Sequence, residues 1–296
     1  MKPQGPPPKT DLLGRLSTWV LGFPPVRWLK PILDDYDEAG GGLLAGGVAF
    51  NSLFAVLPAI LLVVSLLGLF LDDPIRLERT VQAFARQFPP LEEFFRQAFD
   101  QFRAGAVSFS VIGLVGLVWG SSRFYQSLDE AIARIFRGSR RRDPFQRGLR
   151  GVLSVGLLIG AVLVAVVLGQ LVDDVQVDLP GASPLVEVLT STLGSIVGTT
   201  AIFAGVVAVI YRMVPTEPPS WRAIRRPAAA AGVVLAALTG IFAVLTPRLI
   251  GALHVYAAFV AVFAVMIWLS YVAQVLLIGA AWVHRRARAE AERRPL

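Results

Sequence analysis

The chain has 296 residues, of which 55% are hydrophobic and 17% charged, and its mean hydropathy is +0.63. Because an average soluble domain carries about 25% charged residues, this composition excludes a soluble globule and indicates an integral membrane protein. Cysteine is absent, which excludes disulfides, iron–sulfur clusters and thiolate metal sites, and the formal net charge is +7.

The first 38 residues precede any stretch long enough to cross a membrane. Residues 1–10 contain four prolines and no apolar pattern, so they are expected to form a disordered tail. Residues 11–38 mix apolar and basic residues with two tryptophans, which predicts an amphipathic interfacial segment broken at Pro24 and Pro25. We interpret this segment as a membrane-surface anchor, with a lateral gate or lipid sensor as the alternative.

Six stretches are long and apolar enough to form transmembrane helices, since a hydrocarbon core of about 30 Å needs about 20 residues per helical crossing. They lie within residues 39–285, at approximately 40–71, 104–122, 151–172, 188–211, 227–247 and 256–283. The predicted fold class is therefore all-α: a polytopic membrane protein with a bundle of six transmembrane helices and amphipathic interfacial helices. Residues 286–296 are predicted to be a basic cytoplasmic tail.

Basic residues alternate between the two sides of the predicted bundle. One side carries 22 of the 28 Lys and Arg residues and the other carries six, which by the positive-inside rule predicts that both termini are cytoplasmic. The basic excess then faces the anionic headgroups of the cytoplasmic leaflet, and Arg140, Arg141 and Arg142 are the candidate lipid contacts. Membrane lipids are thus the expected partners, without nucleic acid, and a homo-oligomer is left open.

Small residues four apart recur in four of the predicted spans. The pairs are Gly42 with Gly46, Gly116 with Gly120, Gly156 with Gly160, and Gly194 with Gly198. This spacing is typical of closely packed membrane helices, so a tight bundle is expected. The first span also contains Pro58, which predicts a bend in that helix.

The connection at residues 72–103 has apolar residues at helical spacing, interrupted by Pro89 and Pro90. This pattern predicts two short amphipathic helices. They either cap a cavity between the spans or lie flat on the outer leaflet, and amphipathicity alone favours neither alternative.

Titratable side chains are scarce inside the predicted spans. A zinc or two-metal site needs three or more suitable ligands, and the chain contains only His254 and His284 besides its acids. We interpret His284 as a surface residue, and the common hydrolase and nucleotide-binding motifs are absent. The sequence therefore predicts no catalytic residue, no metal and no cofactor, and the protein is not expected to be an enzyme.

The polar or helix-bending residues in and beside the spans are the candidates for a cavity or substrate site. They are Asn51, Ser52, Pro58, Arg123, His254, Tyr256, Tyr271 and Gln274. For each of the polar residues among them, the alternative is a structural hydrogen bond between helices. Asn51 and Gln274 stand out because a buried amide needs partners, and we predict that Asn51 and a polar group of the last span face the bundle interior.

Four segments, in order along the chain, resemble the YihY/BrkB family of bacterial inner-membrane proteins. They are LAGGVAFNSLFAVLPAILL (44–62), WGSSRFYQSLDEAIARIF (119–136), YRMVPTEPPSW (211–221), and the stretch 256–280 with Trp268, Tyr271 and Gly279. The resemblance spans about residues 40–283 and implies a six-helix protein of the inner membrane without a settled activity. At Ala281 the chain departs from many relatives, which carry Glu after Gly-Ala.

The resemblance and the residues together lead to three functional hypotheses. The first is transport or flipping of an amphiphilic, lipid-related substrate. The second is a non-catalytic membrane scaffold or envelope assembly factor. The third is a ribonuclease, after the older family label ribonuclease BN, which is disfavoured because the chain offers no metal cluster or acid–base pair for phosphodiester hydrolysis.

Overall fold

The protein is all-α in the part that the computed structural model describes, which is residues 24–70, 74–87, 89–103, 108–137, 184–215, 217–252 and 257–293. Its helices are α2 (Pro24–Glu38), α3 (Gly41–Phe70), α4 (Pro74–Gln87), α5 (Glu92–Arg103), α6 (Ser108–Ile135), α8 (Pro184–Met213), α9 (Trp221–Ala252) and α10 (Ala257–Glu292). A 3-10 turn, η1, covers Pro89–Leu91 between α4 and α5.

Four of these helices are long and apolar enough to cross a membrane. The qualifying stretches are Gly41–Ser65, Ile196–Met213, Trp221–Leu249 and Phe259–Glu292. They correspond to the first, fourth, fifth and sixth predicted spans. The predicted second span falls on α6, which is not among the four, and the predicted third span, 151–172, lies outside the described residues. The structure thus supports a multi-span helical protein, and the count of six stays a prediction.

Two helices continue well past the ends of their predicted spans. α6 runs on to Ile135 rather than ending near residue 122, and an ion pair of 2.9 Å between Glu130 and Arg134 supports its added turns. α10 reaches Glu292 and so includes part of the predicted tail. Charged residues end an apolar run without ending a helix, because Glu and Arg are good helix formers.

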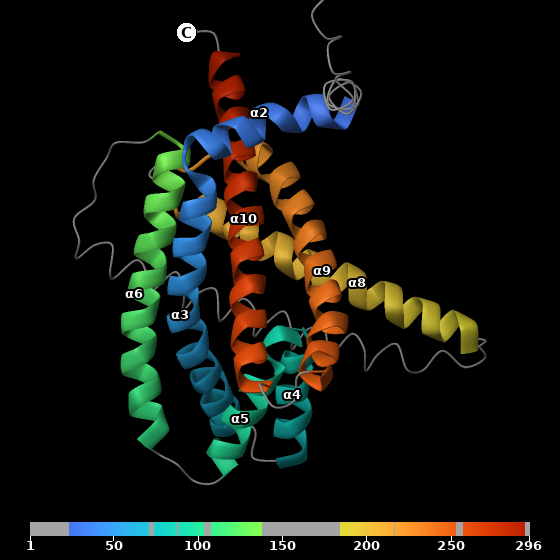
Figure 1. Cartoon of the computed structure of the whole chain (residues 1–296). Helices are drawn as coiled ribbons and strands as arrows, with labels where there is room; N and C mark the ends of the chain where they lie inside the picture. Colours follow the sequence, from blue (N-terminus) through green and yellow to red (C-terminus); the bar gives the residue numbers. More distant parts are fainter. Residues whose placement is uncertain are drawn as a thin grey trace, which may run out of the picture.

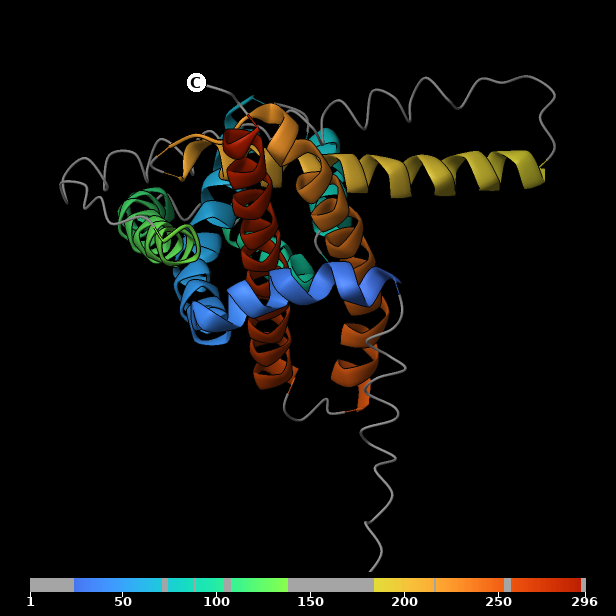
Figure 2. The same cartoon turned by 90° about the horizontal axis from the view of Figure 1, so that it is seen from above.

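The long helices form one bundle (Figure 1). α6 packs against α3, α3 against α10, and α10 against α9, while α8 packs on α9 and crosses the bundle obliquely. α2 lies across the end of the bundle near the C-terminus of the chain, and α4 and α5 gather at the opposite end. Seen from above, α2 crosses α10, with which it is in contact (Figure 2).

α3 and α6 make their closest approach at one of the predicted glycine pairs. A Cβ at Gly120 would lie 2.0 Å from the carbonyl oxygen of Phe54, and one at Gly116 would lie 3.1 Å from the ring of Pro58. The prediction of close packing is confirmed at this pair. The other predicted pairs show no such contact in the described chain. A Cβ at Gly42, Gly46 or Gly198 would have nothing within 4 Å, and Gly194 is exposed, while Gly156 and Gly160 lie outside the described residues.

The segment between α3 and α6 caps the bundle. Its buried apolar side chains form one cluster with α3, α9 and α10, in which Leu91 and Phe95 pack with Val265 and Trp268. α5 contacts α3, and η1 contacts α9 and α10. The segment between α3 and α6 therefore packs on the end of the bundle, as the capping arrangement expects.

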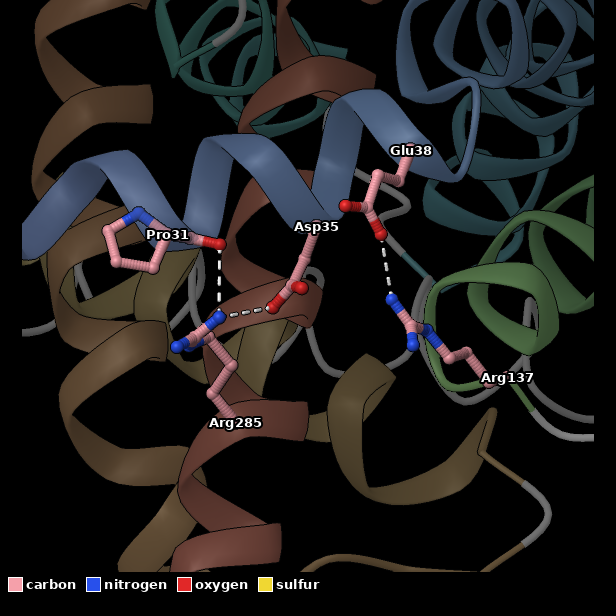
Figure 3. A network of polar contacts seen from close by, with 5 residues as sticks. All are labelled: Pro31, Asp35, Glu38, Arg137 and Arg285. Carbon is pink, nitrogen blue, oxygen red and sulfur yellow. Dashed lines mark hydrogen bonds and ion pairs between the residues drawn. The ribbon is translucent and has the colours of Figure 1, made fainter.

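α2 is attached to the rest of the bundle by two exposed ion pairs (Figure 3). Arg285 of α10 pairs with Asp35 at 2.8 Å and also donates to the carbonyl oxygen of Pro31 at 3.1 Å. Arg137, just after α6, pairs with Glu38 at 2.8 Å. The two pairs join α2 to helices that lie about 100 and 250 residues further along the chain.

Aromatic contacts and a glycine complete the placement of α2. The ring of Trp28 meets that of Trp282 edge-on, with centroids 4.4 Å apart. Gly40 has φ of 72°, a left-handed conformation that suits glycine and allows the sharp turn into α3. Tyr36 is buried against Gly41. Its burial is the main cause, and the charge of Asp37 the second cause, of a raised pKa of the Tyr36 phenol, so the side chain packs in its uncharged form.

Candidate functional site

An apolar cavity of about 280 Å³ lies in the middle of the bundle. It is lined by α3, α5, α6, α8, α9, α10 and η1. Among the described residues of its lining, only Ser52 and the indole of Trp268 carry polar side-chain atoms. The hydroxyl of Ser52 donates to the carbonyl oxygen of Val48 at 2.7 Å, so its hydrogen is used within α3. The apolar cavity therefore suits hydrocarbon rather than a charged or strongly polar ligand.

A second hollow, of about 460 Å³, lies between α3 and α5 at the end of the bundle away from α2. We call it the far hollow. Ile60 lines both the apolar cavity and the far hollow, so the two adjoin there. Gln97, Asp100 and Gln101 of α5 give the far hollow a polar side.

A third hollow, of about 890 Å³, lies at the α2 end of the bundle and has a mixed lining. We call it the polar pocket. Its walls are the last turns of α6, the connection from α8 to α9, and the last turns of α10. The charged or hydrogen-bonding side chains in its lining are Asp129, Arg137, Glu217, Ser220, His284, Arg288 and Glu290.

The connection that forms one wall of the polar pocket is held in place by Arg212, in the last turn of α8. Its guanidinium donates to the carbonyl oxygen of Pro219 at 2.7 Å and to that of Pro218 at 3.3 Å. It also lies 5.9 Å from the ring centroid of Trp221, within the range of a cation–π contact. The wall is thus fixed from within the same chain.

Ser220 links this connection to α9 and α10. Its hydroxyl oxygen accepts the backbone N–H of Ala223 at 3.1 Å, as an N-cap of α9, and its hydroxyl donates to the carboxylate of Glu290. Arg286 donates to the carbonyl oxygen of Arg222 at 3.1 Å, a second tie between α10 and the start of α9. These bonds give the polar pocket a defined shape without a ligand.

His284 lies in the polar pocket and is not the surface residue expected from the sequence. It is partly buried, with its ring centroid 4.9 Å from that of Phe136. Its Nε2 is buried and has no hydrogen-bond partner among the described residues. The reason is the length of the two helices: α6 and α10 both continue past their apolar runs and so enclose this residue.

A packed layer separates the polar pocket from the apolar cavity. Tyr211 is fully buried in this layer, and its hydroxyl donates to the carbonyl oxygen of Leu276 at 2.7 Å. A Cβ at Gly279 would lie 2.1 Å from the same hydroxyl oxygen. Along α10 the cavity ends at Leu276 and the pocket begins at His284, eight residues or about 12 Å further on.

The six predicted cavity residues that the structure describes do not converge. Ser52 lines the apolar cavity, whereas the amide of Asn51 donates to the carbonyl oxygen of Gly47 in its own helix at 2.9 Å. Gln274 is partly buried and reaches the hydroxyl of Ser270 at 3.5 Å. Neither amide lines any of the three hollows described above.

The other candidates are similarly scattered. Tyr271 is 48% exposed, Arg123 is exposed with its guanidinium 5.9 Å from the ring centroid of Trp119, and Pro58 packs at Gly116. His254, Tyr256 and the run Arg140, Arg141, Arg142 lie outside the described residues. Within the described ranges, no group of three or more His, Asp or Glu side chains is placed to hold a metal ion.

Helices of this length and apolarity, bundled around an apolar cavity, define a multi-pass helical membrane protein. The chain belongs to the BrkB family, because the sequence profile described as "Virulence factor BrkB" matches residues 32–296. This confirms the resemblance seen in the four sequence segments.

Two relatives illustrate the family. A UPF0761 membrane protein of Rhodospirillum rubrum is 27% identical over 249 residues, which cover 80% of this chain and 53% of the relative. A UPF0761 membrane protein of Cronobacter sakazakii is 27% identical over 122 residues, covering 40% of this chain and 42% of the relative. The matches thus span about half of each relative or less, and no solved structure matches the chain.

Proposed function

We propose that this protein moves an amphiphilic, lipid-related molecule across the bacterial inner membrane. The observation that carries the proposal is the series of three hollows along the bundle, of which the two outer ones are partly lined by polar side chains and the one between them is apolar. An amphiphile needs this order of environments, because its headgroup loses free energy in hydrocarbon and its tail loses free energy in water.

The polar pocket of about 890 Å³ and the apolar cavity of about 280 Å³ follow one another along the bundle. The polar pocket and the apolar cavity share the helices α6 and α10, so a headgroup in the pocket places its tail toward the cavity. The layer at Tyr211 closes the path on the α2 side, while the far hollow adjoins the cavity at Ile60. Opening one side of a central site while the other is closed is the usual scheme of transporters.

The proposal includes an orientation, with the α2 end and both termini in the cytoplasm. Its support is the sequence asymmetry of 22 basic residues against six. Trp28 and Trp221, both about half exposed, and their neighbour Trp282 gather at the α2 end, and tryptophan is enriched at the level of the lipid headgroups. The polar pocket would then lie at the cytoplasmic interface.

Reconstitution into vesicles with fluorescent phospholipids tests the proposal, with transbilayer movement followed by chemical quenching of the outer leaflet. Ala59→Phe places a ring in the apolar cavity and is expected to slow movement by at least about tenfold, since the tail then has no apolar space. Ala230→Phe is the matched control, because Ala230 is exposed on α9 and lines no hollow described here. Absence of movement across a broad lipid panel, by folded protein, would refute the proposal.

A non-catalytic scaffold is the second candidate, and one observation favours it. The layer around Tyr211 is fully packed, so the described residues leave no continuous passage from the polar pocket to the apolar cavity. A scaffold predicts that Ala59→Phe changes neither lipid movement nor complex formation. The transport proposal predicts loss of lipid movement alone.

A further inference from the structure

We infer that the polar pocket binds a group carrying both a phosphate and an ammonium charge, as in the headgroup of a zwitterionic phospholipid. This inference rests on the proposed function and names the substrate class that the pocket selects. Three observations support it: the charges of the pocket lining, the contacts that hold the pocket walls in place, and the position of the pocket in the bundle.

The charges in the lining have both signs. Among the described residues, the lining includes two guanidiniums, of Arg137 and Arg288, and three carboxylates, of Asp129, Glu217 and Glu290. A purely anionic ligand would meet the three carboxylates, and a purely cationic ligand would meet the two guanidiniums. A ligand with one charge of each sign is the one that this lining matches.

Two of these charges are left without a partner of their own. Glu290 accepts a hydrogen bond from Ser220, and Arg137 pairs with Glu38 of α2. In contrast, Arg288 on α10 and Glu217 in the α8–α9 connection make no hydrogen bond or ion pair with the described chain. They are the groups available to a phosphate and an ammonium, respectively.

The pocket is formed before any ligand arrives. Arg212 fixes the connection that carries Glu217, and Ser220 ties the same connection to α10, which carries Arg288. Because both walls are held by contacts within the chain, a ligand binds without the entropic cost of ordering them. The volume of about 890 Å³ lies within the range of small-molecule sites and exceeds what one ion needs.

The surroundings of the pocket favour a membrane lipid over a dissolved zwitterion. Trp221 follows the connection directly, and Trp282 precedes His284 by two residues, so the pocket lies at a tryptophan-rich level of the bundle. Ile132, Phe136 and Val214 add apolar surface to its lining, and the apolar cavity lies beyond the Tyr211 layer. A headgroup that enters here therefore has a place for its glycerol and chains.

Calorimetric titration of the full chain in phosphatidylglycerol nanodiscs tests the inference with three soluble probes. The probes are glycerophosphoethanolamine, which carries both charges, glycerol 3-phosphate, which carries the anion alone, and ethanolamine, which carries the cation alone. We expect the first to bind at least about tenfold more tightly than either of the others, since each of them leaves one charge of the pocket unmatched. Equal or tighter binding of a single-charge probe, or no binding of any probe, would overturn the inference.

Variants locate the binding in the polar pocket. Arg288→Gln and Glu217→Gln are each expected to weaken glycerophosphoethanolamine by about tenfold, because each removes one of the two free charges. Arg225→Gln and Glu292→Gln are the matched controls, since both residues are exposed and lie outside the lining. If Arg225→Gln weakened binding of the probe as much as Arg288→Gln, or Glu292→Gln as much as Glu217→Gln, the assignment of the binding site to the polar pocket would be contradicted.

A change of lipid distinguishes the two sources of the ligand. Discs in which phosphatidylethanolamine replaces phosphatidylglycerol present the same headgroup from the bilayer, so the soluble probe is expected to bind several-fold more weakly. Unchanged binding would overturn the assignment to a lipid headgroup. If the protein binds the headgroup probe but moves no lipid in vesicles, the headgroup site stands and the proposed function is refuted. If it moves lipids without any preference for the headgroup, the proposed function stands and the headgroup site is refuted.

Discussion

Gly120→Ala is the sharpest test of how the bundle is packed. The Cβ of the alanine would lie 2.0 Å from the carbonyl oxygen of Phe54, 2.5 Å from its carbon and 3.0 Å from the nitrogen of Ala55. A close carbon–oxygen contact needs about 3.3 Å, so α3 and α6 must separate by about 1.3 Å at this level. Backbone atoms cannot turn away as a side chain can, so the whole helix must move.

The expected cost follows from two opposing effects. Overpacking costs about 1–3 kcal/mol, and a clash with backbone belongs at the upper end of that range. Alanine in place of glycine stabilises the helix itself by about 1 kcal/mol, which leaves a net loss of about 2 kcal/mol in the free energy of unfolding. Gly46→Ala is the control, because its Cβ meets nothing within 4 Å and only the helical gain of about 1 kcal/mol remains.

Equilibrium unfolding in mixed micelles, titrated with a denaturing detergent, measures both variants. The same chemical change is expected to lower the free energy of unfolding at Gly120 and to leave or raise it at Gly46, a difference of about 3 kcal/mol. If the two variants fell within about 1 kcal/mol of each other, the close approach of α3 and α6 would be refuted, and with it this reading of the glycine spacing.

Two further predictions concern the layer between the hollows and the attachment of α2. Tyr211→Phe removes a buried hydrogen bond to Leu276 and is expected to lower the free energy of unfolding by about 0.6–1.7 kcal/mol. As a control, Tyr271→Phe, at a half-exposed position, is expected to change the free energy of unfolding by less than about 0.5 kcal/mol. Equal effects of the two variants would contradict the buried hydrogen bond. Arg285→Gln removes the ion pair with Asp35 and is expected to weaken the docking of α2 by about 0.5–1 kcal/mol, seen as faster amide hydrogen exchange in α2. High salt is expected to reduce the difference between Arg285→Gln and the unmodified chain, and equal exchange rates at low salt would count against the pair.

The periodic and apolar features of the fold were predictable from the sequence. The apolar run that begins near Gly40 forms α3, and the prolines at 89 and 90 lie at the turn between two short helices. Both features were predictable because each depends on the sequence within a single helix or turn. Helix ends were less predictable. α6 continues through Asp129 to Ile135 because every third or fourth side chain still packs inward, which a search for uncharged stretches does not detect.

The polar pocket was missed because it is assembled from three parts of the chain that are far apart. Asp129 comes from α6, Glu217 from the connection to α9 and Arg288 from α10, and each by itself reads as a solvated charge beside a span. One signal was present. His284 and Arg288, four residues apart, continue the helical spacing of the last span beyond its final apolar residue, so a helix extended to Glu292 would have brought them onto one face, in the wall of one hollow.

Ala281, where the family resemblance implies a glutamate in many relatives, lies in the packed layer around Tyr211. Ala280 and Ala281 are fully buried, on α10 between the end of the apolar cavity and the start of the polar pocket. A glutamate at Ala281 would place a carboxylate in this packed layer, where a charge without partners costs several kcal/mol. With alanine, the described part of the layer is held by packing and by the hydrogen bond from the Tyr211 hydroxyl to Leu276, so the proposed transport requires α8 to move relative to α10.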